Sequence, residues 1–307
     1  MSHIARKSQA ALLLLALIVF AVESAPLGSQ GAQVPADKPA PVPELTPGSG
    51  YLVGYIADPR NNLPNSFKVL MPPPAAGTNP STLPATTATV TSPGAQAFDE
   101  DVARRSFAMR GTARWNQAIS DAKLSFPHQG ETYSCAINAP INATDTPFLY
   151  QLLHRVLTDA GESTYAAKNH YNRPRPFLLN KQPLCTPEDY DALAKEGSFP
   201  SGHTAVGWSQ AMILAEIVPD RQDEILTRGL SFGESRNVCN AHWFSDVLAG
   251  RMMGAATAAR LHAVPEFLSD LAKAKQEVAA ARAKGLKPSR DCAAEAAALG
   301  QQPRLWP

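Results

Sequence analysis

One segment limits the possible fold more than any other: residues 201–218 are apolar nearly all round. A helix that is apolar on every side has to be covered on every side. Pro219 ends the segment, because proline lacks the amide hydrogen that a helix needs to continue. The segment therefore predicts a central buried helix surrounded by other helices.

The rest of the chain offers those surrounding helices. Apolar residues recur at helical spacing in residues 146–160, whereas we find no alternating strand pattern of any length and no internal repeat. The fold class we expect is therefore all-α, a single helical, bundle-like domain over residues 96–285. We expect its further helices over residues 98–111, 112–122, 163–171, 187–196, 220–235, 243–262 and 265–283.

The two ends differ from this domain. Arg6 and Lys7 precede an uninterrupted apolar run, residues 10–22, which is short for a membrane span and typical of a signal peptide. We expect residues 1–24 to be removed, with an uncleaved membrane anchor as the alternative. Residues 25–95, which hold 14 of the 27 prolines, predict an extended arm with apolar anchors at 51–56 and 67–71. Residues 286–307 form an alanine-rich tail.

Net charge excludes one class of partner. The chain has 28 basic and 27 acidic residues, so it has no global basic field that would favour nucleic acid. Any anion must then be bound by a local cluster of cations.

The four cysteines are Cys135, Cys185, Cys239 and Cys292. An exported chain with an even number of cysteines is expected to form disulfides, and all three pairings of four cysteines stay open. The spacing contains no CxxC element, so we expect no zinc site. A thiol nucleophile at Cys239 is the alternative to a disulfide there.

Three segments carry the residues suited to chemistry: 168–176, 200–203 and 235–246. Lys168, Arg175 and Arg236 are cations near expected helix ends, and guanidinium groups bind phosphate in a bidentate way. Ser201 and Gly202 stand where the central helix begins, and free N–H groups at a helix N-terminus bind anions. Each element alone has an ordinary alternative, namely a surface cation or a simple helix entry.

A histidine–carboxylate pair completes this set. His242 and Asp246 are four residues apart, so a helix places both on one face. The carboxylate then fixes the imidazole tautomer and leaves the other nitrogen as a nucleophile. His203 is free to serve as the general acid. Four further histidines have no partner pattern, and we expect them to be structural or on the surface: His128, His154, His170 and His262.

Together these segments resemble a known signature. The pattern Lys-x6-Arg-Pro, Pro-Ser-Gly-His and Ser-Arg-x5-His-x3-Asp is similar to that of the type 2 phosphatidic acid phosphatase superfamily, which includes bacterial class A acid phosphatases, lipid phosphatases and vanadium haloperoxidases. Stretches around Trp115, Trp208 and Trp243 extend the similarity to the class A enzymes over residues 51–277. Arg173 is a secondary candidate for the position of Arg175. The chain departs from the pattern at an insertion, residues 75–95, and at Phe199, where we expect tyrosine.

The resemblance implies the acid phosphatase/vanadium haloperoxidase type of fold and a metal-independent acid phosphatase without a cofactor. His242 is then the nucleophile that becomes phosphohistidine, Asp246 orients it, and His203 protonates the leaving group and activates water. Five residues would bind the phosphoryl group: Lys168, Arg175, Ser201, Gly202 and Arg236.

The same site allows other functions. A vanadium haloperoxidase would hold vanadate with these residues, and a soluble lipid phosphatase, a phosphotransferase or a silent phosphate-binding protein are further alternatives. We expect a small phosphomonoester substrate, no nucleic acid, no membrane contact after signal removal and a homo-oligomer of at least two subunits. The periplasm is the expected compartment, with full secretion as the alternative.

Overall fold

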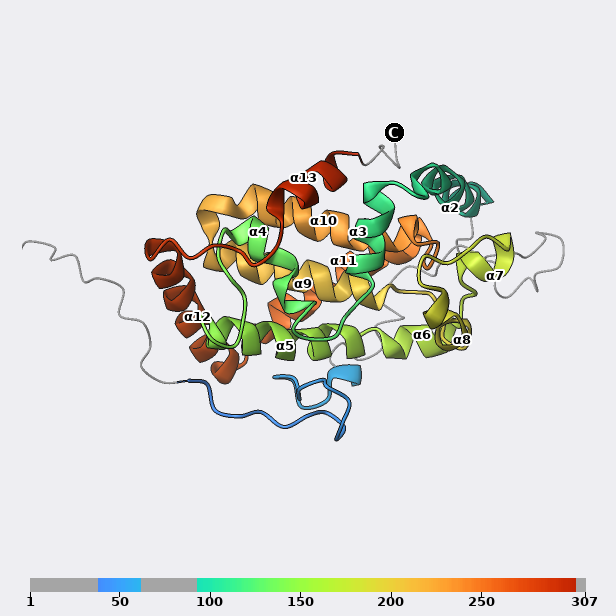
Figure 1. Ribbon diagram of the computed structural model, residues 1–307. Helices are drawn as coiled ribbons and strands as arrows, with labels where there is room; N and C mark the ends of the chain where they lie inside the picture. Colours follow the sequence, from blue (N-terminus) through green and yellow to red (C-terminus); the bar gives the residue numbers. More distant parts are fainter. Residues whose placement is uncertain (1–37, 62–92, 302–307) are drawn as a thin grey trace, which may run out of the picture. The chain divides into compact units, whose positions relative to one another are not determined.

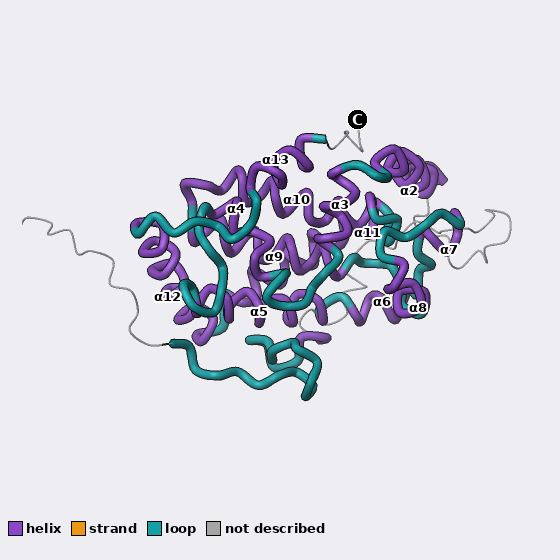
Figure 2. Tube along the Cα trace, viewed as in Figure 1, coloured by secondary structure: helices purple, strands orange, loops and turns teal. Residues whose placement is uncertain are grey.

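The computed structural model describes residues 38–61 and 93–301, and this part of the chain is built from helices (Figure 1). Figure 2 shows helices and loops without a strand in these residues, where a single isolated bridge joins Glu44 to Leu52. The all-α fold predicted from the sequence is confirmed. The longer helices are α2 (Pro93–Ser106), α3 (Ala113–Asp121), α5 (Pro147–Glu162), α9 (Gly202–Ile217), α10 (Gln222–Val238), α11 (Phe244–Leu261), α12 (Pro265–Ala283) and α13 (Cys292–Gly300).

Helix α9 is the central helix predicted from residues 201–218, and it packs against α5, α10 and α11 (Figure 1). Ala205, Val206 and Leu214 on α9 are fully buried. Helix α11 approaches α9 closely because Gly250 of α11, which has no β-carbon, faces the start of α9. A β-carbon at Gly250 would lie 2.6 Å from the Ser201 carbonyl oxygen, inside van der Waals contact. The start of α9 is thereby held directly against α11.

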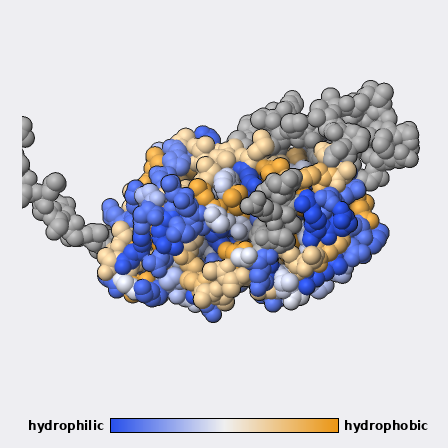
Figure 3. Space-filling model, turned by 90° about the horizontal axis from the view of Figure 1, so that it is seen from above, coloured by the Kyte–Doolittle hydropathy of each residue, from blue (hydrophilic) through white to orange (hydrophobic). Residues whose placement is uncertain are grey.

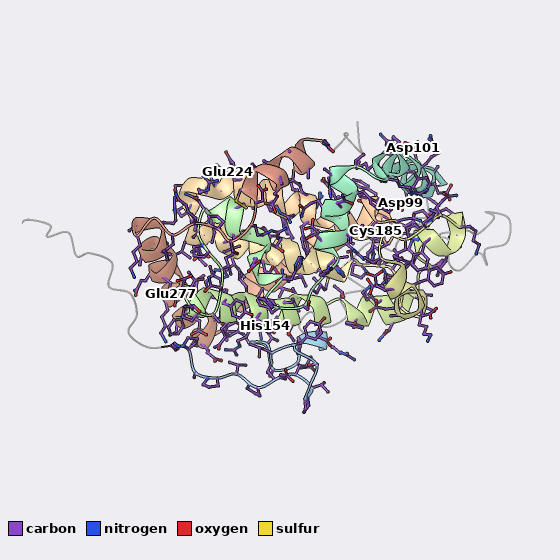
Figure 4. All side chains as sticks on the ribbon, viewed as in Figure 1. Asp99, Asp101, His154, Cys185, Glu224 and Glu277 are labelled. Carbon is purple, nitrogen blue, oxygen red and sulfur yellow. A yellow bond between two sulfur atoms is a disulfide. The ribbon has the colours of Figure 1, made fainter. Side chains whose placement is uncertain are left out.

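Helices α5 and α12 are joined by a buried carboxylate. Glu277 of α12, labelled in Figure 4, accepts hydrogen bonds from the backbone N–H groups of Phe148 (3.1 Å) and Leu149 (3.0 Å). The first N–H groups of a helix have no partner within the helix, and a negative charge there is favourable. This contact fixes the N-terminus of α5 on the bundle.

The described part of the N-terminal arm lies along α5. Asp159 of α5 accepts hydrogen bonds from the backbone N–H groups of Tyr55 (2.8 Å) and Ile56 (3.0 Å), and the Tyr55 ring is buried in the core. The sequence therefore identified the apolar anchor at residues 51–56 correctly. The second anchor at 67–71 and the signal peptide at 1–24 lie outside the described residues, as does most of the insertion at 75–95.

Several helix bounds differ from the prediction. Helix α2 begins at Pro93 rather than at residue 98, and a 3-10 turn, Phe107–Met109, follows it. The segment expected as a helix over 187–196 is a 3-10 turn followed by α8 (Tyr190–Ala194). Helix α13 forms in the alanine-rich tail. The short helices α4 (Ser134–Ile137), α6 (Tyr165–Tyr171) and α7 (Pro176–Asn180) connect the longer ones.

Two disulfides form, as expected, and the structure selects one of the three pairings. Cys135 of α4 is bonded to Cys292 of α13, and Cys185, which Figure 4 labels, is bonded to Cys239 at the end of α10. All four cysteines are consumed, so the alternative of a free thiol nucleophile at Cys239 is wrong.

The surface of the described residues mixes polar and apolar side chains. Figure 3 shows hydrophilic and hydrophobic residues interspersed over the face seen from above. Across residues 38–61 and 93–301, the model contains no helix whose length and apolar character would suit a membrane span.

Candidate active site

The N-terminus of α9 forms one wall of the site. Ser201 caps the helix, since its Oγ accepts a hydrogen bond from the Thr204 N–H (3.3 Å), while its own N–H donates to the Asp246 carbonyl oxygen (3.0 Å). A β-carbon at Gly202 would lie 3.9 Å from Cε of Lys168. The first turn of α9 therefore faces the lysine, with N–H groups that are suited to an anion.

Two of the predicted phosphate-binding cations come together at this end of α9. Lys168 of α6 and Arg175, the residue before α7, are 3% and 1% exposed. Burial and the neighbouring Arg175 lower the pKa of Lys168 to about 7. The lysine is therefore cationic in acid and loses its charge as the pH rises through neutrality.

Arg236 of α10 is the third cation, and its charge is poorly compensated. Its side chain is buried, and two of its guanidinium nitrogens, Nε and Nη1, have no hydrogen-bond partner in the described part of the chain. Burial and the charge of Arg175 lower its pKa to about 10. Because buried donors without partners are costly, this geometry points to an anion as the missing acceptor.

His242 lies between the cations and Asp246. Its Nε2 is 2.9 Å from Nη1 of Arg175, and its Nδ1 is 3.5 Å from Oδ2 of Asp246. Arginine can only donate, so Nε2 is the acceptor and the proton sits on Nδ1, toward the carboxylate. Burial, followed by the charge of Arg175, holds the pKa of His242 well below its usual value, so the imidazole stays neutral in acid.

His203 in the first turn of α9 is held from behind. Its Nε2 lies 2.9 Å from the Ala122 carbonyl oxygen, and a carbonyl accepts, so Nε2 carries the proton. Nδ1 is then free to exchange a proton. Burial, with a smaller effect of Arg236, lowers the pKa of His203 well below its ordinary value in the absence of an anion.

Arg173, the secondary candidate for phosphate binding, has another position. Its Nη1 donates to Oδ1 of Asp246 (2.6 Å), and its Nη2 donates to Oδ2 of Asp99 (2.8 Å), which Figure 4 labels on α2. All three side chains are almost fully buried. Arg173 therefore orients the carboxylate behind His242, whereas Arg175, the residue that the six-residue gap from Lys168 favours, contacts His242 itself.

Some of these groups line a pocket of about 210 Å³, whereas Ser201, Arg236 and Asp246 are not among the residues that line it. Lys168, Arg175, Gly202, His203 and His242 line its polar side. Apolar side chains line the other side, among them Leu45 and Tyr51 from the N-terminal arm. The pocket thus offers cations and an imidazole to a phosphate group and an apolar surface to whatever the phosphate is attached to.

Phe199, where the sequence departs from the expected tyrosine, has no place in this pocket wall. Its ring is 3% exposed and packs edge-on against Tyr171, with ring centroids 5.4 Å apart. Phe199 therefore lies outside the set of residues that line the pocket.

Two parts of the site were missed in the sequence. The side chain of Glu196 lines the pocket beside Arg175, and Asp99 of α2 reaches Arg173 from outside the three motifs. Glu196 stands close before the Pro-Ser-Gly-His segment, which is a weak signal, whereas nothing in the sequence pattern marks Asp99.

The four histidines that were expected to be structural or on the surface have partners within the fold. Nε2 of His154 donates a hydrogen bond to the Gly50 carbonyl oxygen (2.8 Å), and the His154 ring stacks on Phe126. The other contacts are those of His128 with Ser120, His170 with Tyr171, and His262 with Glu216. Within the described ranges, no group of three His, Cys, Asp or Glu side chains is placed to hold a metal ion.

Comparisons with known proteins agree with this geometry. Residues 148–269 match the PAP2 superfamily. The chain is 42% identical to an acid phosphatase of Zymomonas mobilis over 193 residues, which is 63% of this chain and 73% of that protein. It is 43% identical to a non-specific acid phosphatase of Salmonella typhimurium over 182 residues (59% and 73%), and 44% identical to one of Providencia stuartii over 172 residues (56% and 69%).

Proposed function

The chain belongs to the PAP2 superfamily and to its bacterial class A acid phosphatases, and from this premise we propose that it hydrolyses a broad range of phosphate monoesters through a phosphohistidine at His242, without a metal ion. Its class as a phosphoric monoester hydrolase follows from its relatives. The observation that carries the mechanism is the buried Arg236, with two unpartnered nitrogens, beside a neutral His242.

Binding comes first. Lys168, Arg175 and Arg236, with the Ser201 hydroxyl and the Gly202 N–H, would hold the three non-bridging phosphoryl oxygens. An oxygen that takes over the Nη1 donor of Arg175 also releases Nε2 of His242, which accepts from that donor in the empty pocket. Substrate binding thereby exposes the lone pair that attacks.

Two displacement steps follow. Nε2 of His242 attacks phosphorus, the ester P–O bond breaks, and His203 gives its proton to the leaving oxygen, so an alcohol departs. Water then attacks phosphorus and gives its proton to His203, the P–N bond breaks, and inorganic phosphate is released. Asp246, held by Arg173, stabilises the positive charge on the His242 ring in the intermediate.

The acid range of the activity follows from these charges. His242 stays neutral in acid because its pKa is depressed by burial and by Arg175. Burial, followed by the charge of Arg236, lowers the pKa of His203, and a bound phosphate anion opposes this effect and favours the protonated imidazole. Lys168, whose pKa is about 7, loses its charge above neutral pH, which limits activity on the alkaline side.

The test combines metal removal with one substitution. We expect hydrolysis of p-nitrophenyl phosphate at about pH 5.5 to persist in excess EDTA and to fall by about 10³-fold or more in His242→Ala. His262→Ala, a surface histidine paired with Glu216, is the matched control and should keep full activity. An alkaline quench during turnover should trap phosphate on the wild type and none on His242→Ala. Activity that needs added metal would contradict the mechanism.

We further propose that the protein works outside the cytoplasm, in the periplasm, as a homo-oligomer. Both disulfides support export, because such bonds persist in oxidising compartments. Fractionation of cells that express the full chain tests the compartment, and light scattering of the purified protein tests the subunit number.

A further inference from the structure

A carboxylate already occupies two of the cations that the phosphate needs. Oε2 of Glu196 lies 2.7 Å from Nη2 of Arg175 and 3.8 Å from Nζ of Lys168. The Glu196 side chain is 29% exposed and lines the pocket that Lys168 and Arg175 also line, so a ligand that enters this pocket can contact it.

The two cations do not depend on this carboxylate for their position. Nε of Arg175 donates to the Leu193 carbonyl oxygen (2.9 Å), and Nζ of Lys168 donates to the Gly197 carbonyl oxygen (2.8 Å). Nη1 of Arg175 also donates to the Ala241 carbonyl oxygen (3.1 Å). Backbone acceptors on both sides therefore hold the cations when the Glu196 side chain is not in contact.

A phosphoryl oxygen and the Glu196 carboxylate seek the same donors. A guanidinium nitrogen that donates to a carboxylate has to exchange that bond when phosphate arrives, and two anions a few ångströms apart repel each other. Building on the proposed function of this site, we propose that Glu196 is an internal competitor for phosphate, which weakens the binding of the inorganic phosphate product and speeds its release.

The surroundings of Glu196 keep it ionised during turnover. Lys168 and Tyr165 face it from α6, and Arg175 faces it from the start of α7. Burial alone would raise the pKa of Glu196, but these cations and the tyrosine hydroxyl hold it below its ordinary value. The competitor is therefore negative throughout the mildly acidic range.

A gain in phosphate affinity on removing the charge is the expected signature. In Glu196→Gln, which keeps the shape of the side chain, the inhibition constant of inorganic phosphate against p-nitrophenyl phosphate should fall about tenfold at about pH 5.5, equivalent to about 1.4 kcal/mol of binding. Glu162→Gln is the matched control. Glu162 lines the same pocket but pairs with Arg60, so the inhibition constant of inorganic phosphate should not change in this variant.

The pH dependence gives a second readout. Glu196 supports the charge on Lys168, so its removal should lower the Lys168 pKa further and move the alkaline loss of phosphate binding to lower pH. If Glu196 served only in packing, the pH at which phosphate binding is lost on the alkaline side would not change. The Glu196→Ala variant should show the same two changes.

Two results would overturn the proposal, and they differ in kind. Weaker phosphate binding in both Glu196 variants, with unchanged melting temperatures, would mean that Glu196 helps to bind phosphate, while the phosphatase site itself would stand. If phosphate fails to inhibit the wild type competitively, the proposed function of the site fails together with this inference.

Discussion

Helix α10 carries two buried arginines, Arg228 and Arg236, in opposite electrostatic settings. Arg228 is 2% exposed and donates to both carboxylate oxygens of Asp121, at 2.6 and 3.2 Å. Arg236, two turns further along, is 1% exposed and has two nitrogens without a partner in the described chain. Burial acts on both, but the pKa of Arg228 is raised by Asp121, whereas that of Arg236 is lowered to about 10.

We interpret the difference as that between a charge neutralised inside the fold and a charge that the proposed function assigns to a ligand. Asp121 is also held by the Ser235 hydroxyl (2.6 Å), so the charge of Arg228 is neutralised inside the fold. The charge of Arg236 instead adds to those of Lys168 and Arg175. Residue type and burial are the same at the two positions, so only the presence of a carboxylate tells the two roles apart.

The largest effect is expected from Arg236→Met. Loss of this donor should lower kcat/KM by about 10⁴-fold, because an arginine that stabilises a transferring phosphoryl group contributes on this scale. The free energy of unfolding should stay within about 1 kcal/mol of the wild type, since a poorly compensated buried charge is removed. Steady-state kinetics and urea unfolding measure the two quantities. If Arg236→Met were strongly destabilised but still active, Arg236 would be the structural arginine, contrary to the comparison.

The mirror experiment is Arg228→Met. It leaves Asp121 buried without its partner and should reduce the free energy of unfolding by about 3–5 kcal/mol. The kcat/KM of the molecules that remain folded should change by less than about threefold, because Asp121 neutralises the charge of Arg228 within the fold. Kinetics normalised to the folded fraction, from circular dichroism, give the check. A selective loss of activity would join Arg228 to the site.

The two disulfides repeat the comparison at a smaller scale. Replacing Cys135 and Cys292 by alanine should cost about 2–4 kcal/mol of stability and leave kcat/KM unchanged, because this bond joins α4 to α13. Replacing Cys185 and Cys239 should cost stability and also lower kcat/KM about tenfold, since Cys239 lies between Arg236 and His242. Equal activity in both double variants would show that the second bond does not position the site.

The smallest expected effect concerns pH. Lys168 is cationic below its pKa of about 7, so phosphate inhibition of the wild type should weaken progressively above neutral pH. Arginine stays charged across this range, so Lys168→Arg should move the alkaline limb upward by more than about one pH unit, at a lower kcat. Lys195→Arg, an exposed neighbour, is the control. If the alkaline side of the pH profile does not move in Lys168→Arg, the titration belongs to another group, with His203 as the next candidate.

Local patterns in the sequence predicted the elements that carry their own signal. The apolar residues of α9 and the three motif segments needed no knowledge of partners, because burial on all sides and helix-end chemistry are properties of the segments themselves. The start of α2, the helix in the tail and the role of Arg173 needed tertiary contacts. Arg173 and Arg175 look alike in the sequence, and only the placement of Asp246 and Asp99 separates them.

The bond between Cys185 and Cys239 has a consequence for the cell that makes this enzyme. It closes a loop that begins after α7 and ends between Arg236 of α10 and His242. If the protein is exported as proposed, this loop would stay open in the reducing cytosol, and hydrolysis of cytosolic phosphate esters would run below the full rate. Under the same proposal, the bond would form and full activity would arise only after export.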